Sequence, residues 1–263
     1  MVFFSGIGAL VAAWAGNFRA GMDFLGETCV SAGTALVRPR TFRFGDFMLA
    51  FQRASYDGIP VAAGIGFLLG VILAFQSAAA LRMFGVEVYV ADLLAISLFR
   101  ELGPIVTAII LAGRTGSAFA AEIGSMKVNE ELDALTTMGI GPVRFLVLPR
   151  VAAAVLAMPV LTIFAELSGL AGGALVLGLM NVPGAVFWDH AVSSSGMFTV
   201  SVGLVKSALF GLLVAMVSCH CGMRTESTAD GVGRSATRSV VGSIVAVAVA
   251  DGILAVVCYL WGW

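Results

Sequence analysis

Five ionisable residues lie within stretches of this chain that are otherwise apolar, and these are the residues that could do chemistry. They are Arg100, Glu101, Glu166, Lys206 and Asp251. A charged side chain inside a bilayer costs free energy, so it usually faces a cavity or an oppositely charged partner. These residues are therefore the first candidates for a functional site.

Arg100 and Lys206 are the two cations of this set. At a rise of about 1.5 Å per residue, each lies about 12 Å below the outer face of its expected span. Equal depth permits a shared basic site in an outward-facing pocket, with Glu101 or Asp251 neutralising part of its charge. The alternative is an internal salt-bridge lock that holds helices together. Both interpretations stay open at this level.

Cys219, His220 and Cys221 suggest a metal site by residue type, because thiolates and imidazoles are good zinc ligands. The chain has only one other histidine, His190. Adjacent helical positions also point about 100° apart. Free cysteine usually buries as a small apolar side chain, and we favour that interpretation. We expect no metal site.

Nucleotide-binding and catalytic patterns are missing. Residues 113–117 lack the lysine and the spacing of a phosphate-binding loop. The sequence contains no Ser/His/Asp or Glu-x-x-His constellation, and two histidines leave little room for acid–base catalysis. We expect no catalytic site in this chain, so any energy from ATP must come through another chain.

The elements that must position the charged residues are membrane-spanning helices. The chain has 263 residues and is 59% hydrophobic and 12% charged, whereas soluble domains are about 25% charged. Crossing a hydrocarbon core of about 30 Å takes roughly 20 apolar residues. Segments of that length lie near residues 59–81, 92–113, 151–180, 199–221 and 239–262. The predicted fold class is an all-α polytopic membrane protein with five transmembrane helices.

Two glycine pairs predict close helix packing, and one proline predicts a distortion of the third span. Gly66 with Gly70, and Gly169 with Gly173, offer flat helix surfaces for close approach. This signal is weak, since the chain has 32 glycines. Pro159 predicts that the long third span is tilted, kinked or partly re-entrant.

Basic residues predict the orientation, because cytoplasmic loops carry an excess of Lys and Arg. Five basic residues lie in the N-terminal region, four in the 114–150 connection and three in the 223–238 connection. Five spans place all three regions on one side, and the opposite side has only Arg82. We expect a multi-pass protein with a cytoplasmic N-terminus and the C-terminus outside.

Residues 1–57 are expected to form an amphipathic N-terminal region, followed by the transmembrane domain at 58–263. The apolar residues of its first stretch recur at helical spacing, at Phe3, Ile7, Leu10, Trp14 and Phe18. No basic residue precedes this stretch, which argues against a signal peptide. The pattern favours a helix lying in the headgroup plane.

A second amphipathic stretch leads into the first span, with Phe44, Phe47, Phe51 and Ala54 on its apolar side. A membrane-surface role is the favoured interpretation for the whole N-terminal region. Ordinary packing against other helices is the alternative.

The connection between the second and third spans, residues 114–150, is longer than a hairpin needs. Val128, Leu132 and Leu135 fall at i, i+4 and i+7, so they can line one helix face. Acidic residues lie largely off that face, and Lys127 can pair with Glu131 one turn on. An acidic rim would be repelled by anionic lipid. The pattern therefore favours docking of this helix into a groove on another protein.

Residues 99–104, 112–118 and 121–126 closely resemble the MlaE (YrbE) permease family, the membrane subunits of ABC transporters that work with MCE-domain lipid carriers. The resemblance continues through residues 130–135, Pro149-Arg150 and Lys206-Ser207. It reaches residues 233–241 and Asp251, and so covers nearly the whole chain.

The resemblance implies roles for the residues named above. Arg100, Glu101 and Lys206 match positions that line the family's phospholipid pocket, and Asp251 belongs to the same pattern. The polar connection becomes a coupling helix that sits in the groove of an ATPase. Its candidate contacts are Glu122, Lys127, Glu130, Glu131, Asp133 and Leu135.

The resemblance also implies partners. It implies a homodimer in the bacterial inner membrane, bound to two copies of a cytoplasmic ATPase that hold ATP and magnesium, and capped by a periplasmic MCE-domain hexamer. It leaves open whether a small STAS-domain regulator joins. We expect phospholipid as the substrate, no nucleic-acid partner and no cofactor in this chain.

The implied function is a permease subunit, not an enzyme, that moves phospholipids between the inner membrane and the periplasmic carrier and so maintains outer-membrane lipid asymmetry. One alternative is a secondary transporter driven by an ion gradient through Glu101, Glu166 and Asp251. Such proteins often contain inverted repeats, and we find none in five unequal spans. Another alternative is a membrane anchor with no transport path.

Overall fold

The computed structural model describes residues 19, 21–35, 37 and 42–260, and all the regular structure in these ranges is helical. Five of its helical segments are long and apolar enough to cross a membrane. They are Phe44–Phe84, Glu87–Val128, Val143–Leu179, Met197–Met223 and Ala229–Leu260. The predicted all-α polytopic fold is confirmed. The apolar stretch that predicted an interfacial helix, residues 2–18, lies outside the described residues.

The first span contains α2 (Phe44–Ser55), α3 (Ile59–Leu81) and the short 3-10 helix η2 (Arg82–Phe84). α3 matches the predicted 59–81 segment, and Pro60 at its first turn suits a helix start. The buried residues of α3 are all small and follow one stripe, at Ala62, Gly66, Gly70, Ala74 and Ala78. α2 packs against α8 (Leu148–Leu179), which favours the packing interpretation for this stretch.

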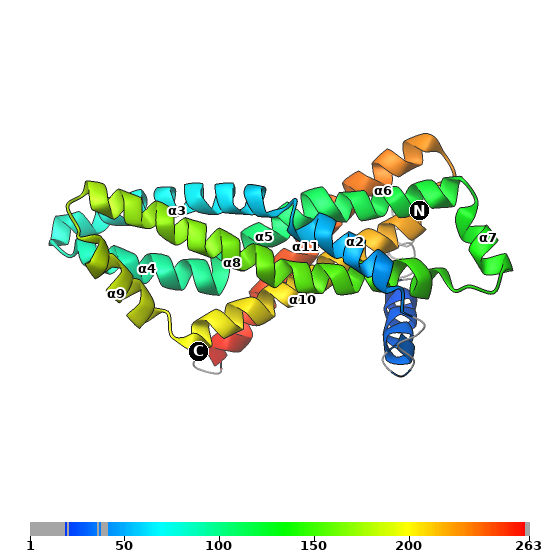
Figure 1. Cartoon of the computed structure of the whole chain (residues 1–263), viewed down its shortest axis with the longest axis horizontal. Coiled ribbons are helices and arrows are strands. Elements are labelled where there is room, and N and C mark those ends of the chain that lie inside the picture. The colour runs from blue at the N-terminus through cyan, green and yellow to red at the C-terminus, as the bar shows by residue number, and fades with distance from the viewer. Residues whose placement is uncertain (1–18, 20, 36, 38–41, 261–263) are drawn as a thin grey trace, which may run out of the picture.

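Of the four glycines singled out from the sequence, Gly66, Gly70 and Gly169 lie in the contact between α3 and α8, whereas Gly173 faces Leu94 of the second span. A Cβ added at Gly70 would lie 1.8 Å from the Gly169 carbonyl oxygen, and one at Gly66 would lie 2.2 Å from the Ala165 carbonyl oxygen. The backbones therefore approach more closely than any side chain would allow. Figure 1 shows α3 and α8 running alongside each other.

The second span is one long run of helical turns. It comprises η3 (Glu87–Tyr89), α4 (Val90–Ser97), the π-helix η4 (Leu98–Leu102), α5 (Gly103–Leu111), the π-helix η5 (Ala112–Gly116) and α6 (Ser117–Val128). The helix therefore continues beyond the predicted end of the span near residue 113. Phe119, Ala120 and Ile123 continue the buried side of this helix, so the chain stays helical past its first charged residues.

The third span also begins earlier than predicted, with the π-helix η6 (Val143–Val147) leading into α8. Residues 129–142 separate the two long helical segments and hold the short helix α7 (Glu131–Thr137). α8 stays a single helix through Pro159. Helix therefore occupies both ends of the predicted 114–150 connection, because charge alone does not end a helix.

The remaining helices are α9 (Gly184–Ser194), α10 (Met197–Met223) and α11 (Ala229–Leu260). α10 and α11 pack against each other, and both contact α6. The molecule is elongated, with α7 at one end of its long axis and α9 near the other (Figure 1). This arrangement separates the predicted coupling segment from the opposite ends of the spans.

The α3–α8 contact makes a test of the fold. Gly70→Ala forces a Cβ against a backbone carbonyl that cannot rotate away, so we expect a loss of about 1–3 kcal/mol of stability. Gly64→Ala is the matched control in the same helix, because nothing lies within 4 Å of its added Cβ. Thermal unfolding of both variants in one detergent would measure this. Equal melting temperatures would contradict the close α3–α8 contact.

Candidate functional site

Four ionisable side chains from three segments meet within the membrane-spanning part of the chain, and we call them the charge cluster. Arg100 and Glu101 lie on η4, Lys206 on α10 and Asp251 on α11. The Lys206 ammonium contacts Oε2 of Glu101 and lies 2.5 Å from Oδ1 of Asp251. Nε of Arg100 lies 3.7 Å from Oε1 of Glu101. The structure thus joins all four predicted pocket residues, with a formal net charge of zero.

Exposure differs strongly within the charge cluster. The Lys206 side chain is only 6% exposed, whereas Arg100 and Glu101 are 38% and 35% exposed. Lys206 is therefore enclosed between two carboxylates, which is the geometry of the salt-bridge lock. Arg100 and one side of Glu101 lie at the surface of this chain. A lipid-binding role for these residues stays a prediction.

A glycine allows α10 to come close enough to form the charge cluster. A Cβ at Gly203 would lie 2.0 Å from the Phe99 carbonyl oxygen, so the two backbones are in direct contact. Lys206 lies one turn further along α10 and reaches Glu101 from there. Any larger residue at position 203 would push η4 and Lys206 apart.

The π-helical geometry of η4 also follows from the local sequence. The Gly103 N–H bonds to the Leu98 carbonyl five residues earlier, as in a π-helix. Pro104, at the start of α5, has no N–H to give to the Arg100 carbonyl. The widened turn therefore lies just before a proline, where the ordinary helical bond cannot form, and it carries both Arg100 and Glu101.

Behind η4, a buried polar row joins α5 to α8. Glu166 is 2% exposed, and its Oε1 lies 2.7 Å from the position that a Gly103 Cβ would take. One turn away, the hydroxyls of Thr107 and Thr162 are 2.8 Å apart. Glu166 thus packs against the junction of η4 and α5, outside the charge cluster. Glu166 could be singled out from the sequence by its charge, but no pattern in the sequence indicated Thr107 or Thr162.

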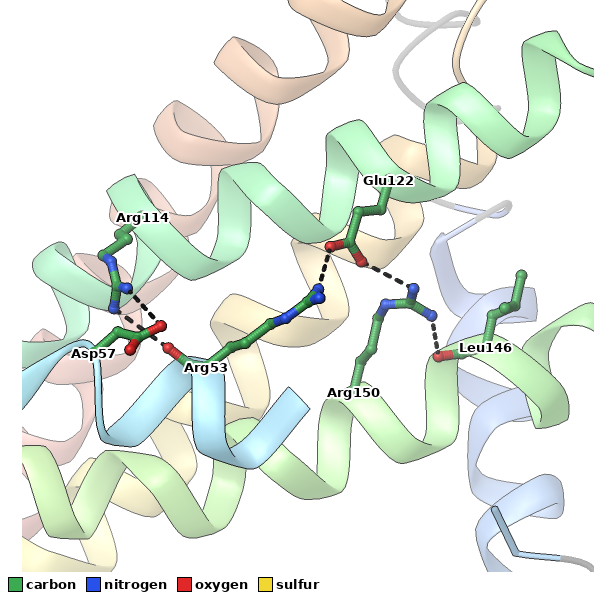
Figure 2. A network of polar contacts seen from close by, with 6 residues as sticks. All are labelled: Arg53, Asp57, Arg114, Glu122, Leu146 and Arg150. Carbon is green, nitrogen blue, oxygen red and sulfur yellow. Dashed lines mark hydrogen bonds and ion pairs between the residues drawn. The ribbon is translucent and has the colours of Figure 1, made fainter. Parts of the chain in front are cut away.

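The predicted coupling residues divide between two places, and Glu122 is not on α7. Figure 2 shows the Glu122 carboxylate, on α6, between the guanidinium groups of Arg53 from α2 and Arg150 from α8. Arg53 donates to Oε1 over 3.3 Å and Arg150 to Oε2 over 3.0 Å. Arg150 also donates to the Leu146 carbonyl over 2.9 Å. Glu122 therefore links three helices of its own chain.

A second contact fixes the same region. Nη2 of Arg114, on η5, lies 3.3 Å from Oδ2 of Asp57, in the turn between α2 and α3. Its Nη1 donates to the Arg53 carbonyl over 3.3 Å (Figure 2). These partners could not be predicted from the sequence, because residues 53 and 114 become neighbours only through the packing of the first span on the second.

Lys127 does not form the predicted pair with Glu131. It donates instead to the Met223 carbonyl at the end of α10 over 2.9 Å. α6 ends at Val128, and Glu130 has a left-handed backbone with φ of 60°. The predicted continuous helix from residue 128 to 135 is therefore wrong, since the chain turns at Asn129 and Glu130.

α7 has one buried side and one acidic side. Leu132 and Leu135 are buried against the chain's own core, so Leu135 holds α7 in place. Glu130, Glu131 and Asp133 are exposed. These three carboxylates are the predicted coupling residues that are exposed on α7, and their contact with a partner stays a prediction.

Residues 47–257 match the family described as Permease MlaE. The chain belongs to the MlaE permease family. It is 36% identical over 200 residues to a probable ABC transporter permease protein of Rickettsia typhi, covering 76% of this chain and 77% of the relative. It is 36% identical over 196 residues to the intermembrane phospholipid transport system permease protein MlaE of Haemophilus influenzae, covering 74% and 75%.

The chain is also similar to a plant protein. The chain is 35% identical over 204 residues to the chloroplastic protein TRIGALACTOSYLDIACYLGLYCEROL 1 of Arabidopsis thaliana. This match covers 77% of the chain and 58% of the relative. The family match begins within α2 and includes every residue of the charge cluster and of the Glu122 contacts.

The Glu122 contacts generate a stability prediction. Glu122→Gln removes the charge between Arg53 and Arg150, and we expect a loss of about 1 kcal/mol, the upper range for partly exposed ion pairs. Glu131→Gln is the matched control, because Glu131 contacts only the exposed Asn129 amide among the described residues. Thermal unfolding in detergent would compare the melting temperatures of the two variants with that of the wild type. If both variants melt together with the wild type, Glu122 does not hold the three helices.

Proposed function

We propose that this chain is the permease subunit of an ABC transporter that moves phospholipids between the inner membrane and a periplasmic MCE-domain carrier, and so helps to maintain outer-membrane lipid asymmetry. The observation that carries the proposal is the family match over residues 47–257. The 36% identity to a permease named for intermembrane phospholipid transport supports the choice of substrate.

The charge cluster suits a lipid headgroup through Arg100. An arginine binds phosphate by two parallel hydrogen bonds, and these are stronger than bonds between neutral groups. The Arg100 side chain is 38% exposed, so it can reach a headgroup at the surface of this chain while Glu101 holds it from behind. Lys206 is enclosed by Glu101 and Asp251 and fixes the position of η4. In a homodimer, the two Arg100 side chains would line one pocket.

The second span offers a direct path from motor to pocket. α5, η5 and α6 continue one another from Gly103 to Val128. At about 1.5 Å per residue, Arg100 and Lys127 lie about 40 Å apart along this path. Exposed Glu130, Glu131 and Asp133 would dock α7 into a cytoplasmic ATPase, which binds the ATP and magnesium. Closure of the ATPase dimer would then move α6 and reshape the pocket.

The same proposal fixes the orientation. The α7 end of the long axis is cytoplasmic and the α9 end is periplasmic, where an MCE-domain hexamer would cap the dimer. This agrees with the excess of basic residues at the α7 end of the spans. A small STAS-domain regulator would bind on the ATPase side.

Arg100→Ala tests the lipid-binding role. It removes the exposed cation but leaves the Lys206 ion pairs in place, so we expect an assembled transporter with phospholipid transfer reduced about ten-fold, as for a lost charge-assisted hydrogen bond. Transfer would be measured from labelled vesicles to the periplasmic carrier by the reconstituted complex. Arg82→Ala is the matched control, because Arg82 is a surface arginine outside the charge cluster. Unimpaired transfer by assembled Arg100→Ala would refute the proposed headgroup contact.

A further inference from the structure

A cavity of about 680 Å³ lies where α10 ends and α11 begins. Residues 21–25, at the start of a helical stretch over residues 21–35, close one side of it, and the buried Phe24 packs its ring on His220 with centroids 5.1 Å apart. Neither the charge cluster nor the residues of Figure 2 line this cavity. Arg224 lies about 27 Å along α10 from Lys206, at the usual helical rise. The cavity is therefore a separate site.

The lining divides into an apolar wall and a basic end. Leu213, Met216 and Val217 form the wall on α10, with Met22 and Leu25 opposite. The basic end is made by Arg224, just past α10, and by two arginines one turn apart on α11, Arg234 and Arg238. The volume is within the range of about 300–1,000 Å³ that is usual for small-ligand sites.

The arginines of the basic end differ in their partners. Arg234 is held by Glu226 at 2.6 Å and by Asp230 at 3.5 Å, so its charge is compensated. No carboxylate in the described ranges forms an ion pair with Arg238. Arg224 adds a further positive charge at the same end. The basic end therefore carries an excess of positive charge beside an apolar wall.

We propose that this cavity binds an anionic phospholipid of the cytoplasmic leaflet, with its phosphate at Arg224 and Arg238 and one acyl chain along the α10 wall. Basic pockets between transmembrane helices on the cytoplasmic side suit anionic headgroups. Arginine binds phosphate oxygens by paired, charge-assisted hydrogen bonds. A free phosphate would leave the apolar wall unfilled, and an uncharged lipid would leave Arg238 without a counter-charge. The inference rests on the proposed function only for the orientation of the chain.

Photolabelling of the intact transporter in nanodiscs tests this site. The probe is phosphatidylglycerol with a diazirine in its acyl chain, added to phosphatidylcholine nanodiscs, and labelled peptides are mapped by mass spectrometry. We expect label on residues 21–25 and 213–217. Arg238→Ala should lower it about ten-fold, Arg238→Lys should retain most of it, and the surface control Arg82→Ala should leave it unchanged.

Two further arms identify the ligand. In the first, phosphatidylcholine with the same diazirine tail is used on the wild type. It should label these segments as weakly as phosphatidylglycerol labels the Arg238→Ala variant. Inorganic phosphate should not displace the lipid label; displacement at millimolar phosphate would make free phosphate the ligand and overturn the proposal. Equal labelling of wild type and folded Arg238→Ala would also overturn it. Label at 213–217 without label near Lys206 would support this site and contradict the proposed lipid pocket instead.

Discussion

The ammonium group of Lys206 is enclosed within the membrane-spanning part of the protein, and the rest of the structure must supply its counter-charges. Glu101 from η4 and Asp251 from α11 both contact it. A buried cation without a partner costs several kcal/mol, so this requirement fixes η4, α10 and α11 relative to one another. Gly203 makes the contact possible by letting the α10 backbone touch that of Phe99.

The same helix that carries Glu101 is anchored again at its other end. Glu122 links α6 to α2 and α8 through Arg53 and Arg150, and Lys127 links α6 to the end of α10. A force applied at α7 therefore acts on a helix held at two points, not on a free connection. This construction favours movement of α6 as a rigid body, together with the residues of η4 at its far end.

The sequence predicted the parts of this arrangement that depend on composition and on the free-energy cost of placing charge in a membrane. Charges inside apolar stretches are expensive, so Arg100, Glu101, Lys206 and Asp251 could be singled out before their contacts were known. The α3 bounds and the Gly66 and Gly70 contact surface followed from apolar length and small-residue spacing. The roles of these residues in lipid binding and coupling stay predictions.

Other features depend on which helices become neighbours, and the sequence could not predict them. The helix of the second span runs to Val128 because its buried side continues against α10 and α11, beyond the membrane exit expected at Arg114. Lys127 donates to the Met223 carbonyl of α10. Helical spacing indicated Glu131 as its partner, because spacing within one helix says nothing of a neighbouring helix. Thr107 and Thr162 carry no charge, and only the packing of α5 on α8 brings their hydroxyls together.

The claim that α7 controls the pocket is tested most directly by counting phospholipids bound to the complete transporter in nanodiscs, before and after trapping its ATPase with ATP and vanadate. We expect trapping to release phospholipid from the wild type. Glu130→Lys with Glu131→Lys on α7 should prevent this release, whereas Asp189→Lys on α9 should not. An unchanged phospholipid count in a trapped wild-type transporter would contradict the control of the pocket by α7.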